Sequence, residues 1–335
     1  MPRRLETLLD GLDAFQRRHS TVGVPWAIQK KFSEDRSGDL SALLAYYGFL
    51  SFFPLLLVFA AILSFVLQGN PSLEARIISS AEHQFPSLSE YVHVGTTSSN
   101  GLALAVGVLF ALWGGLAVTY AAQHAMNDVW GVSVLRRPSF VKRIVRGLGL
   151  LTLLGGILLA TTFLSGLSGA QGPHSGALDA LAVVAAFLLN VVLYLLAFQL
   201  LTAVHVAWGK LVPGAVVGAA LWTALQYLGG YYTRHVVAHA THLYGSFAIV
   251  IGMLAWIYLG ARVTIYSAQL NVVLTWQLWP RSLRGTELTA ADLTAQQWQV
   301  DKVDRRAAAW KEGPTRRGEE AARGAVAAEG NVSQP

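Results

Sequence analysis

The sequence predicts an all-α, polytopic membrane protein, built as a bundle of six transmembrane helices with a kinked first span. Hydrophobic residues make up 53% of the 335 residues, and charged residues make up only 13%. The mean hydropathy is +0.45. The apolar residues gather in six runs, each close to the length of about 20 residues that crosses a bilayer as a helix. These three observations together indicate the fold class before any motif is considered.

The six predicted spans alternate with segments of unequal charge. The spans are Leu40–Leu67, Gly101–Ala122, Leu148–Leu167, Ala180–Ala203, Val212–Tyr231 and Ser246–Leu274. Seven Lys and Arg residues precede residue 39, five lie between residues 123 and 147, and nine follow residue 279, whereas the opposite side carries only Arg76 and Arg234. The positive-inside rule therefore places both termini in the cytoplasm. We expect an amphipathic cytoplasmic segment over residues 1–38, a membrane domain over 39–279 and a largely disordered cytoplasmic tail over 280–335.

The amino-terminal segment carries two short helical patterns. Apolar residues from Leu5 to Phe15 repeat at helical spacing between two pairs of arginines, and a second pattern covers Trp26 to Phe32. The first pattern is typical of a helix on the inner leaflet, but packing against the rest of the protein explains it equally well. Both interpretations stay open from the sequence.

The first span contains Pro54 near its middle. Proline has no backbone N–H and clashes with the carbonyl four residues earlier, here that of Leu50, so the sequence predicts a kink. The carbonyls freed by such a kink need a donor inside the membrane, and Arg262 in the last span is the candidate.

The last span carries that arginine near the middle of an apolar run. On a helix Arg262 shares a face with Tyr266 and Gln269, so the three residues form a polar stripe that should face protein. The arginine is either a structural element or an anion contact in a pathway. Its expected partners are Asp39, Asp128, the carbonyls near Pro54 or an external anion.

Three segments carry a resemblance to a known family. They are FSEDRSGDLSALLAYYGFLSFFPLLL at the start of the first span, MNDVWGV from Met126 to Val132, and the stretch from Tyr244 to Asn271. Together they resemble the signatures of the YihY/BrkB family of bacterial inner-membrane proteins, whose members have been labelled ribonucleases. The resemblance implies a multi-pass protein of the bacterial cytoplasmic membrane. The family commonly carries a glutamate where this chain has Gln269, which puts any role for a carboxylate there in doubt.

Other polar residues offer weaker sites. Asn127 and Asp128 end the second span in a polar cluster that predicts either a helix-end hydrogen-bond network or a gate. His235, His239 and His242 share a helical face and could bind zinc or copper, but no carboxylate lies near them in the sequence. The chain has no cysteine. We expect no cofactor and no metal.

The sequence favours a binding or transport function over an enzymatic one. The membrane domain lacks the clustered carboxylates that a metal-dependent nuclease needs, and no Walker-type glycine loop is present. The expected function is binding or moving an anionic or amphipathic envelope substrate, such as a lipid, through Arg262, Gln269, Tyr266, Asp39, Pro54, Asn127 and Asp128. A membrane scaffold or assembly factor is the alternative, and a membrane-bound ribonuclease is disfavoured. Expected partners are membrane lipids, an anionic lipid or solute, or a second copy of the chain, and not nucleic acid.

Overall fold

The fold was obtained as a computed structural model, which describes residues 11, 13–66, 101–132, 137–169, 176–232, 246–283 and 288–301. The long helices are α2 (Ser20–Glu34), α3 (Ser37–Val66), α5 (Gly101–Val129), α6 (Phe140–Gly169), α7 (Gly176–Leu201), α8 (Trp208–Tyr232) and α10 (Ser246–Thr275). Residues 13–18 and 290–301 are also helical, and the described residues include no strand. The prediction of an all-α protein is confirmed for these ranges.

A helix forms at each of the six apolar runs. By length and composition, three helices in the described ranges could cross a membrane, and these are Val183–Leu201, Trp208–Gly229 and Val250–Thr275. Pro54 lies inside α3, which continues to Val66. The chain is therefore a helical protein with several segments suited to a bilayer.

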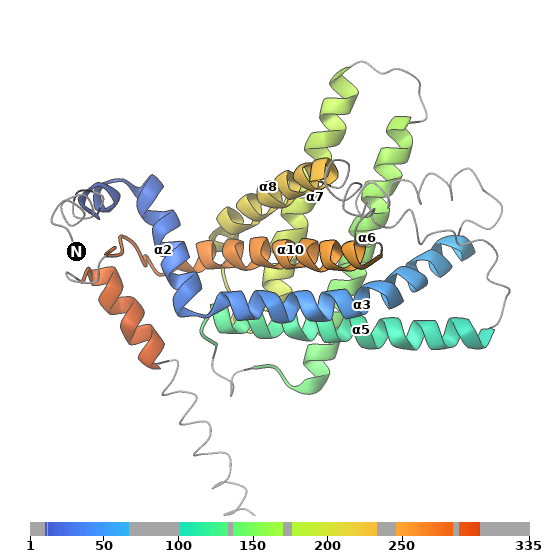
Figure 1. Cartoon of the computed structure of the whole chain (residues 1–335), viewed down its shortest axis with the longest axis horizontal. Helices are drawn as coiled ribbons and strands as arrows, with labels where there is room; N and C mark the ends of the chain where they lie inside the picture. Colours follow the sequence, from blue (N-terminus) through green and yellow to red (C-terminus); the bar gives the residue numbers. More distant parts are fainter. Residues whose placement is uncertain are drawn as a thin grey trace, which may run out of the picture.

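The helices are arranged around α10. Figure 1 shows α3, α5 and α10 running side by side, while the hairpin of α6 and α7 crosses them and α8 lies obliquely against α10. At one end of these helices α2 packs against α10 and α3, and the helix formed by residues 290–301 lies beside that end. This arrangement brings both ends of the described chain to the same side of the bundle.

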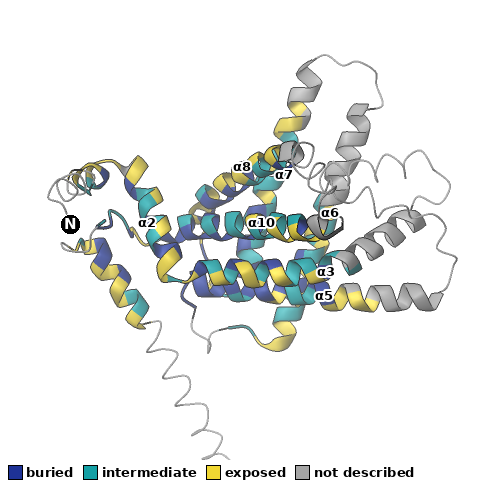
Figure 2. Cartoon of the chain, viewed as in Figure 1, coloured by how far each residue is buried: buried dark blue, intermediate teal, exposed yellow. Residues whose placement is uncertain are grey.

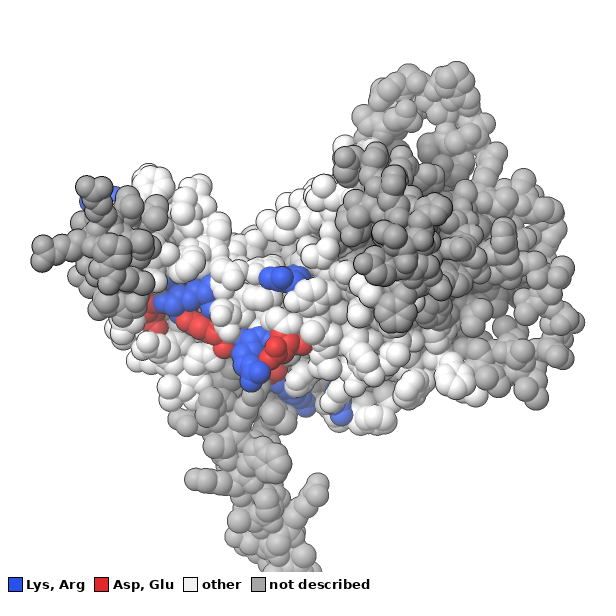
Figure 3. Space-filling model, in the orientation of Figure 1, with Lys and Arg blue, Asp and Glu red and all other residues white. Residues whose placement is uncertain are grey.

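Buried residues gather where α3, α5 and α10 run together, toward the end that meets α2 (Figure 2). Away from that end, large apolar side chains are exposed, and Trp113 on α5 and Tyr227 on α8 each expose 70% of their surface. Figure 3 shows charged side chains gathered near α2, with a mostly uncharged described surface beyond them. An apolar exterior of this kind suits contact with lipid, because lipid tails are as apolar as the exposed side chains and their exposure there costs no hydrophobic free energy.

Two glycines bring α8 into close contact with α10. A Cβ built on Gly214 would lie 2.3 Å from the carbonyl oxygen of Ser267, and one built on Gly218 would lie 3.0 Å from the hydroxyl of Ser267. The backbone N–H of Gly214 donates a hydrogen bond of 2.7 Å to Oδ1 of Asn271. Two small residues four positions apart lie on one face of α8 and allow its backbone to approach α10 closely.

Several sequence predictions lie outside the described residues. They are the first part of the amphipathic pattern, residues 5–10, the three histidines at 235, 239 and 242, and the tail after residue 301.

Candidate functional site

The polar stripe of α10 faces α2, as the sequence predicted for a stripe that meets protein. The guanidinium carbon of Arg262 lies 5.4 Å from the ring centroid of Phe32, 5.7 Å from that of Tyr258 and 5.6 Å from that of Tyr266. Aromatic faces attract a cation at these distances. Arg262 also donates a hydrogen bond of 3.3 Å to the hydroxyl of Tyr266.

Tyr266 fixes this arrangement to α2. Its ring stacks on Phe32 with the centroids 4.0 Å apart and the planes 4° from parallel. Its hydroxyl donates a hydrogen bond of 2.6 Å to Oε1 of Gln29. Arg262 stays partly exposed, and no carboxylate pairs with it among the described residues. The site is thus a cation held by aromatic rings, with most of its five N–H donors left for other acceptors.

The expected acidic partners of Arg262 are occupied elsewhere. Asp39 forms an exposed ion pair of 2.8 Å with Arg36 at the turn between α2 and α3. Asp128 accepts a hydrogen bond of 2.8 Å from Arg137 and lies 3.4 Å from His124. Arg262 therefore takes its contacts from α2 and from its own helix.

Gln269 lies one turn further along α10 and is fully buried. Its Nε2 donates to Oδ2 of Asp35 at 3.0 Å and to the hydroxyl of Ser37 at 2.9 Å. Asp35 also pairs with the buried ammonium of Lys31 and accepts a hydrogen bond of 2.8 Å from Gln299. Gln269 therefore serves as a donor to a buried carboxylate and joins α10 to the start of α3.

This geometry explains why an amide fits at position 269. Replacing Gln269 with glutamate would place a second carboxylate against Asp35 and remove two donated hydrogen bonds. We expect Gln269→Glu to lower the free energy of unfolding by about 2–3 kcal/mol, because hydrogen bonds to charged groups contribute about that much. Thermal unfolding in detergent at pH 7 measures it, and Gln269→Met serves as a control that removes the donors without adding charge. A Gln269→Glu protein as stable as the parent would contradict the assignment of Asp35 as the ionised acceptor.

Asn127 and Asp128 belong to the end of α5. The N–H of Val132 donates to the carbonyl of Asn127 at 2.8 Å, the N–H of Gly131 donates to that of Asp128 at 3.1 Å, and Gly131 has a φ of 63°. These are the two hydrogen bonds of a Schellman motif, which needs a residue in the left-handed conformation and so favours glycine. The segment MNDVWGV is therefore a helix-ending signal.

Asn127 also connects α5 to α7. Its Oδ1 accepts a hydrogen bond of 2.8 Å from the N–H of Ala203, and its Nδ2 donates to the carbonyl of Gln123 at 2.7 Å. These contacts correspond to the helix-end network that the sequence offered as one of two alternatives. The structure brings Arg262 and Tyr266 together and places Gln269 near them, but it places Asn127 and Asp128 in a separate network.

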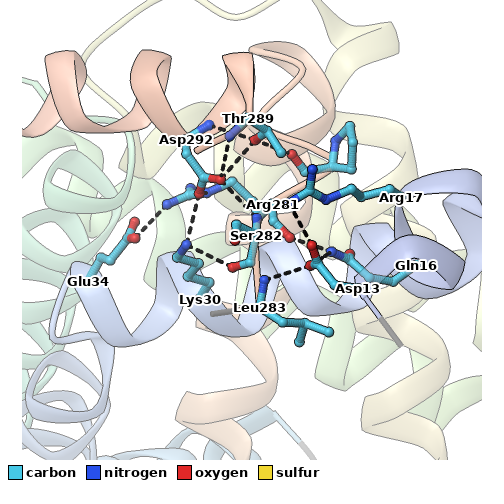
Figure 4. A network of polar contacts seen from close by, with 11 residues as sticks. Asp13, Gln16, Arg17, Lys30, Glu34, Arg281, Ser282, Leu283, Thr289 and Asp292 are labelled. Atoms are coloured by element: carbon cyan, nitrogen blue, oxygen red, sulfur yellow. Dashed lines mark hydrogen bonds and ion pairs between the residues drawn. The ribbon is translucent and has the colours of Figure 1, made fainter. Parts of the chain in front are cut away.

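A second polar cluster was not found from the sequence. Figure 4 shows the segment after α10 clasped between α2, residues 13–17 and the helix 290–301. Arg281 is 1% exposed; its Nε donates to Asp292 at 2.7 Å, and its guanidinium also pairs with Glu34. Lys30 pairs with the same Asp292 oxygen at 2.8 Å. We call this set, Asp13, Gln16, Lys30, Glu34, Arg281, Ser282 and Asp292, the terminal clasp.

Asp292 is the centre of the terminal clasp. Its second oxygen accepts hydrogen bonds from the backbone N–H of Ser282 at 2.8 Å and from Thr289. Thr289 and Asp292 form a capping pair, Thr-x-x-Asp, at the start of the helix 290–301. This spacing is the one signal in the sequence that could have located part of the cluster. The partner of Asp292 on α2, Lys30, lies 262 positions away along the chain.

The carboxyl of Asp292 is held ionised. Burial alone would raise its pKa, but hydrogen bonds from Lys30, Ser282, Thr289 and Arg281 outweigh burial and hold the pKa far below its ordinary value. The pKa of Asp13 is lowered as well: burial opposes the shift, while hydrogen bonds from Leu283 and Gln16 and the charge of Arg17 favour it.

We expect the terminal clasp to be lost in acid. A group whose pKa is depressed by folding stabilises the folded state above its unfolded pKa, which is about 3.9 for Asp, and that contribution disappears as the pH falls toward the folded value. The docking of residues 288–301 should therefore be constant from pH 7 to about pH 5 and weaken progressively below about pH 4. Limited proteolysis of the carboxy-terminal segment across this range measures the change. Uniform protection down to about pH 2 would contradict it.

The described residues hold no group of three or more His, Asp or Glu side chains placed to bind a metal ion. The predicted histidine site at 235, 239 and 242 lies outside those residues.

Long apolar helices, a mostly uncharged exterior and charged groups gathered mainly at one end define a helical integral membrane protein. Residues 28–287 match the model of the Virulence factor BrkB family. The chain belongs to this family, and the resemblance drawn from its three motifs is confirmed.

Two of the three relatives described here carry the name UPF0761 membrane protein. The chain is 27% identical over 278 residues to a UPF0761 membrane protein of Pseudomonas aeruginosa (strain LESB58), a match that covers 79% of this chain and 66%, just under two thirds, of the relative. It is 26% identical over 266 residues to a UPF0761 membrane protein of Tolumonas auensis, covering 75% of this chain and 85% of that protein. It is 28% identical over 265 residues to an uncharacterized protein of Dickeya dadantii, covering 71% and 79%. No solved structure matches the chain.

Proposed function

We propose that this protein binds an anionic or amphipathic envelope lipid and moves it within the membrane, with Arg262 at the contact with the head group. The proposal includes six spans, a first span kinked at Pro54, and both termini in the cytoplasm of a bacterium whose inner membrane holds the chain. It assigns no catalytic residue and no cofactor.

The observation that carries the proposal is the uncompensated charge of Arg262. Lys31, Arg137 and Arg281 also lie in the packed part of the protein, and each of them pairs with a carboxylate. Arg262 contacts aromatic rings and one hydroxyl, and it pairs with no described carboxylate. A charge inside an apolar helix is costly and therefore marks a functional site by default. A guanidinium in this state suits a phosphate or carboxylate, which it can bind through two parallel hydrogen bonds.

The rings around Arg262 also support binding. Phe32 and Tyr266 are stacked, and Tyr266 is tied to Gln29, so the guanidinium rests on a fixed aromatic surface. A preorganised donor loses little freedom when its ligand arrives. The site further lies on α10, a helix with the length and composition of a membrane span, and lipid can therefore approach it.

Replacing Arg262 with glutamine tests the proposal. The full chain is reconstituted into phosphatidylcholine vesicles that contain a fluorescent short-chain phosphatidylglycerol, and a membrane-impermeant quencher reports its movement between leaflets. We expect the parent protein to accelerate this movement and Arg262→Gln to slow it about tenfold or more, because charge-assisted hydrogen bonds contribute about 1.5–3 kcal/mol each. The temperature of thermal unfolding should change little, because removing the guanidinium leaves no buried carboxylate of the described chain without its ionic partner.

Two controls make this result interpretable. Arg36→Gln removes an arginine from an exposed ion pair and should leave lipid movement unchanged. Arg262→Lys keeps the charge but not the planar fork, and should retain part of the activity. If Arg262→Gln instead unfolds the protein, or if the parent moves no lipid while folded, the proposal is wrong and the arginine is structural.

A membrane scaffold or assembly factor is the second candidate. The helix 290–301 is docked by the terminal clasp and leaves Leu293 and Val300, two turns apart, about half exposed. Apolar side chains on one face of a docked helix outside the bundle suit a partner protein. Co-purification of a stoichiometric partner that is lost in Leu293→Ser, with no lipid movement by the parent protein, would favour this function over transport.

A further inference from the structure

A second surface of the molecule combines basic and apolar side chains. The first two turns of α6, together with Tyr120 on α5, form it, and we call it the α6 surface. Phe140 and Val141 are each 68% exposed, and Val145 is 63% exposed. Lys142 is exposed beside them, and Arg143 is half-buried. These residues share no helix with the Arg262 site, which lies on α2 and α10.

The charges of this surface have no acidic counterpart in the sequence around them. No Asp or Glu occurs from Val129 to Leu178, a stretch that contains five Lys and Arg residues. Two of those arginines have structural contacts: Arg137 pairs with Asp128, and Arg146 donates to the carbonyl of Thr202 at 3.3 Å, at the end of α7. Lys142 and Arg143 remain available for an external anion, since neither pairs with a described carboxylate.

Contacts with aromatic rings hold the side chain of Arg143 in place. Its guanidinium carbon lies 5.0 Å from the ring centroid of Tyr120 and 6.0 Å from that of Phe140. The carbonyl of Arg143 accepts a hydrogen bond of 3.1 Å from Gln123 on α5, which fixes this turn of α6. The tight packing of Gly147 against Thr119 holds the two helices together one turn further on. The rings thus hold the Arg143 side chain in place while part of it stays exposed.

We propose that the α6 surface binds the head group of an anionic phospholipid whose acyl chains lie against Phe140, Val141 and Val145. Arg143 contacts the phosphate, Lys142 adds a second positive charge, and the exposed apolar side chains contact the chains below the head group. Neither a soluble anion nor a purely apolar partner would use both kinds of side chain. This site is separate from the proposed lipid movement at Arg262, and it holds a lipid as a bound component of the protein.

Native mass spectrometry of the full chain tests the site. The protein is released from nanodiscs of phosphatidylcholine and phosphatidylglycerol mixed at about 9:1, and the retained lipids are identified by mass. We expect the parent to retain phosphatidylglycerol well above its share of the bilayer. The double variant Lys142→Gln/Arg143→Gln should lower that enrichment by about tenfold or more, because each basic residue near the surface contributes roughly fivefold to the binding of an anionic lipid.

The charge-matched control is Arg36→Gln/Lys210→Gln, which removes two positive charges from exposed positions elsewhere. It should retain the enrichment of the parent. Phe140→Ser/Val141→Ser should lower the total lipid retained while the preference for phosphatidylglycerol persists.

Equal losses of phosphatidylglycerol enrichment in Lys142→Gln/Arg143→Gln and in the control pair, or no loss in Lys142→Gln/Arg143→Gln, would overturn the site. Displacement of the lipid by excess glycerol phosphate would overturn the assignment to a membrane lipid. Failure here leaves the movement assay on Arg262 unaffected.

Discussion

Replacing Asp292 with alanine should release the carboxy-terminal segment from the bundle, at a cost of about 3–5 kcal/mol in the free energy that docks it. Asp292 is 1% exposed and accepts hydrogen bonds from Arg281, Lys30, Ser282 and Thr289. Without it, the buried guanidinium of Arg281 keeps only Glu34 as an ionic partner among the residues that the structure describes. A buried ion pair that loses one member leaves an uncompensated charge, and this loss costs far more than the pair contributes.

Hydrogen exchange of the full chain in detergent measures this release. Exchange of α2 and of residues 288–301 should rise about a hundredfold or more in Asp292→Ala, while α8 and the apolar part of α10 keep the protection of the parent. Asp39→Ala is the matched control, because Asp39 pairs with Arg36 at the surface, with 70% of its side chain exposed. Exposed pairs contribute about 0–1 kcal/mol, and Asp39→Ala should therefore exchange almost as the parent does. Equal effects of the two substitutions would show that the terminal clasp does not hold the segment.

The double variant Arg281→Met/Asp292→Leu separates charge from packing. Removing both charges replaces a polar pair with apolar side chains of similar reach, and such replacements are often neutral in other proteins. The double variant should therefore be more protected than Asp292→Ala alone. Residues in direct contact are expected to behave in this non-additive way.

The helices were predictable because their signals are local. Each apolar run from Leu40 to Leu274 became a helix, since a segment of that length and composition has one way of satisfying its backbone in lipid. The stripe of Arg262 and Tyr266 was also predictable, because a spacing of four residues puts two side chains on one face. The chain's membership of the family could be recognised from three short motifs for the same reason, because the residues of each motif lie close together in the sequence.

The partners of those helices were not predictable, because they depend on contacts between distant segments. Nothing in the sequence near Arg262 indicates that the aromatic rings around its guanidinium would include Phe32, which belongs to a helix far earlier in the chain. Asp39 likewise had no feature in the sequence that excluded it as a partner, although the left-handed turn at Arg36 directs it to an exposed pair. The terminal clasp joins Lys30 to Asp292 across 262 positions, and a single sequence contains no signal for a pair of this kind.

Replacing Gly214 with alanine should separate α8 from α10 and destabilise the protein by about 3 kcal/mol, the upper part of the range for overpacking. The added Cβ would lie 2.3 Å from the carbonyl oxygen of Ser267 and 2.4 Å from Nδ2 of Asn271. The first of these atoms belongs to the backbone of a helix and cannot rotate away. The helices would have to move apart, and the hydrogen bond from the Gly214 N–H to Asn271 would lengthen or break.

A glycine of α10 provides the control. A Cβ on Gly252 would meet no atom within 4 Å, and Gly252→Ala should be neutral or stabilise the helix by up to about 1 kcal/mol, the difference in helix propensity between the two residues. Thermal unfolding of both variants in the same detergent measures the contrast. Gly214→Ala should unfold several degrees below the parent, and Gly252→Ala at or above it. Because α10 also carries Arg262, lipid movement should be measured in Gly214→Ala as well. Unchanged lipid movement in that variant would show that the Arg262 site depends on α2 and α10 and not on α8. Equal stability of the two variants would instead contradict the close approach of α8 to Ser267.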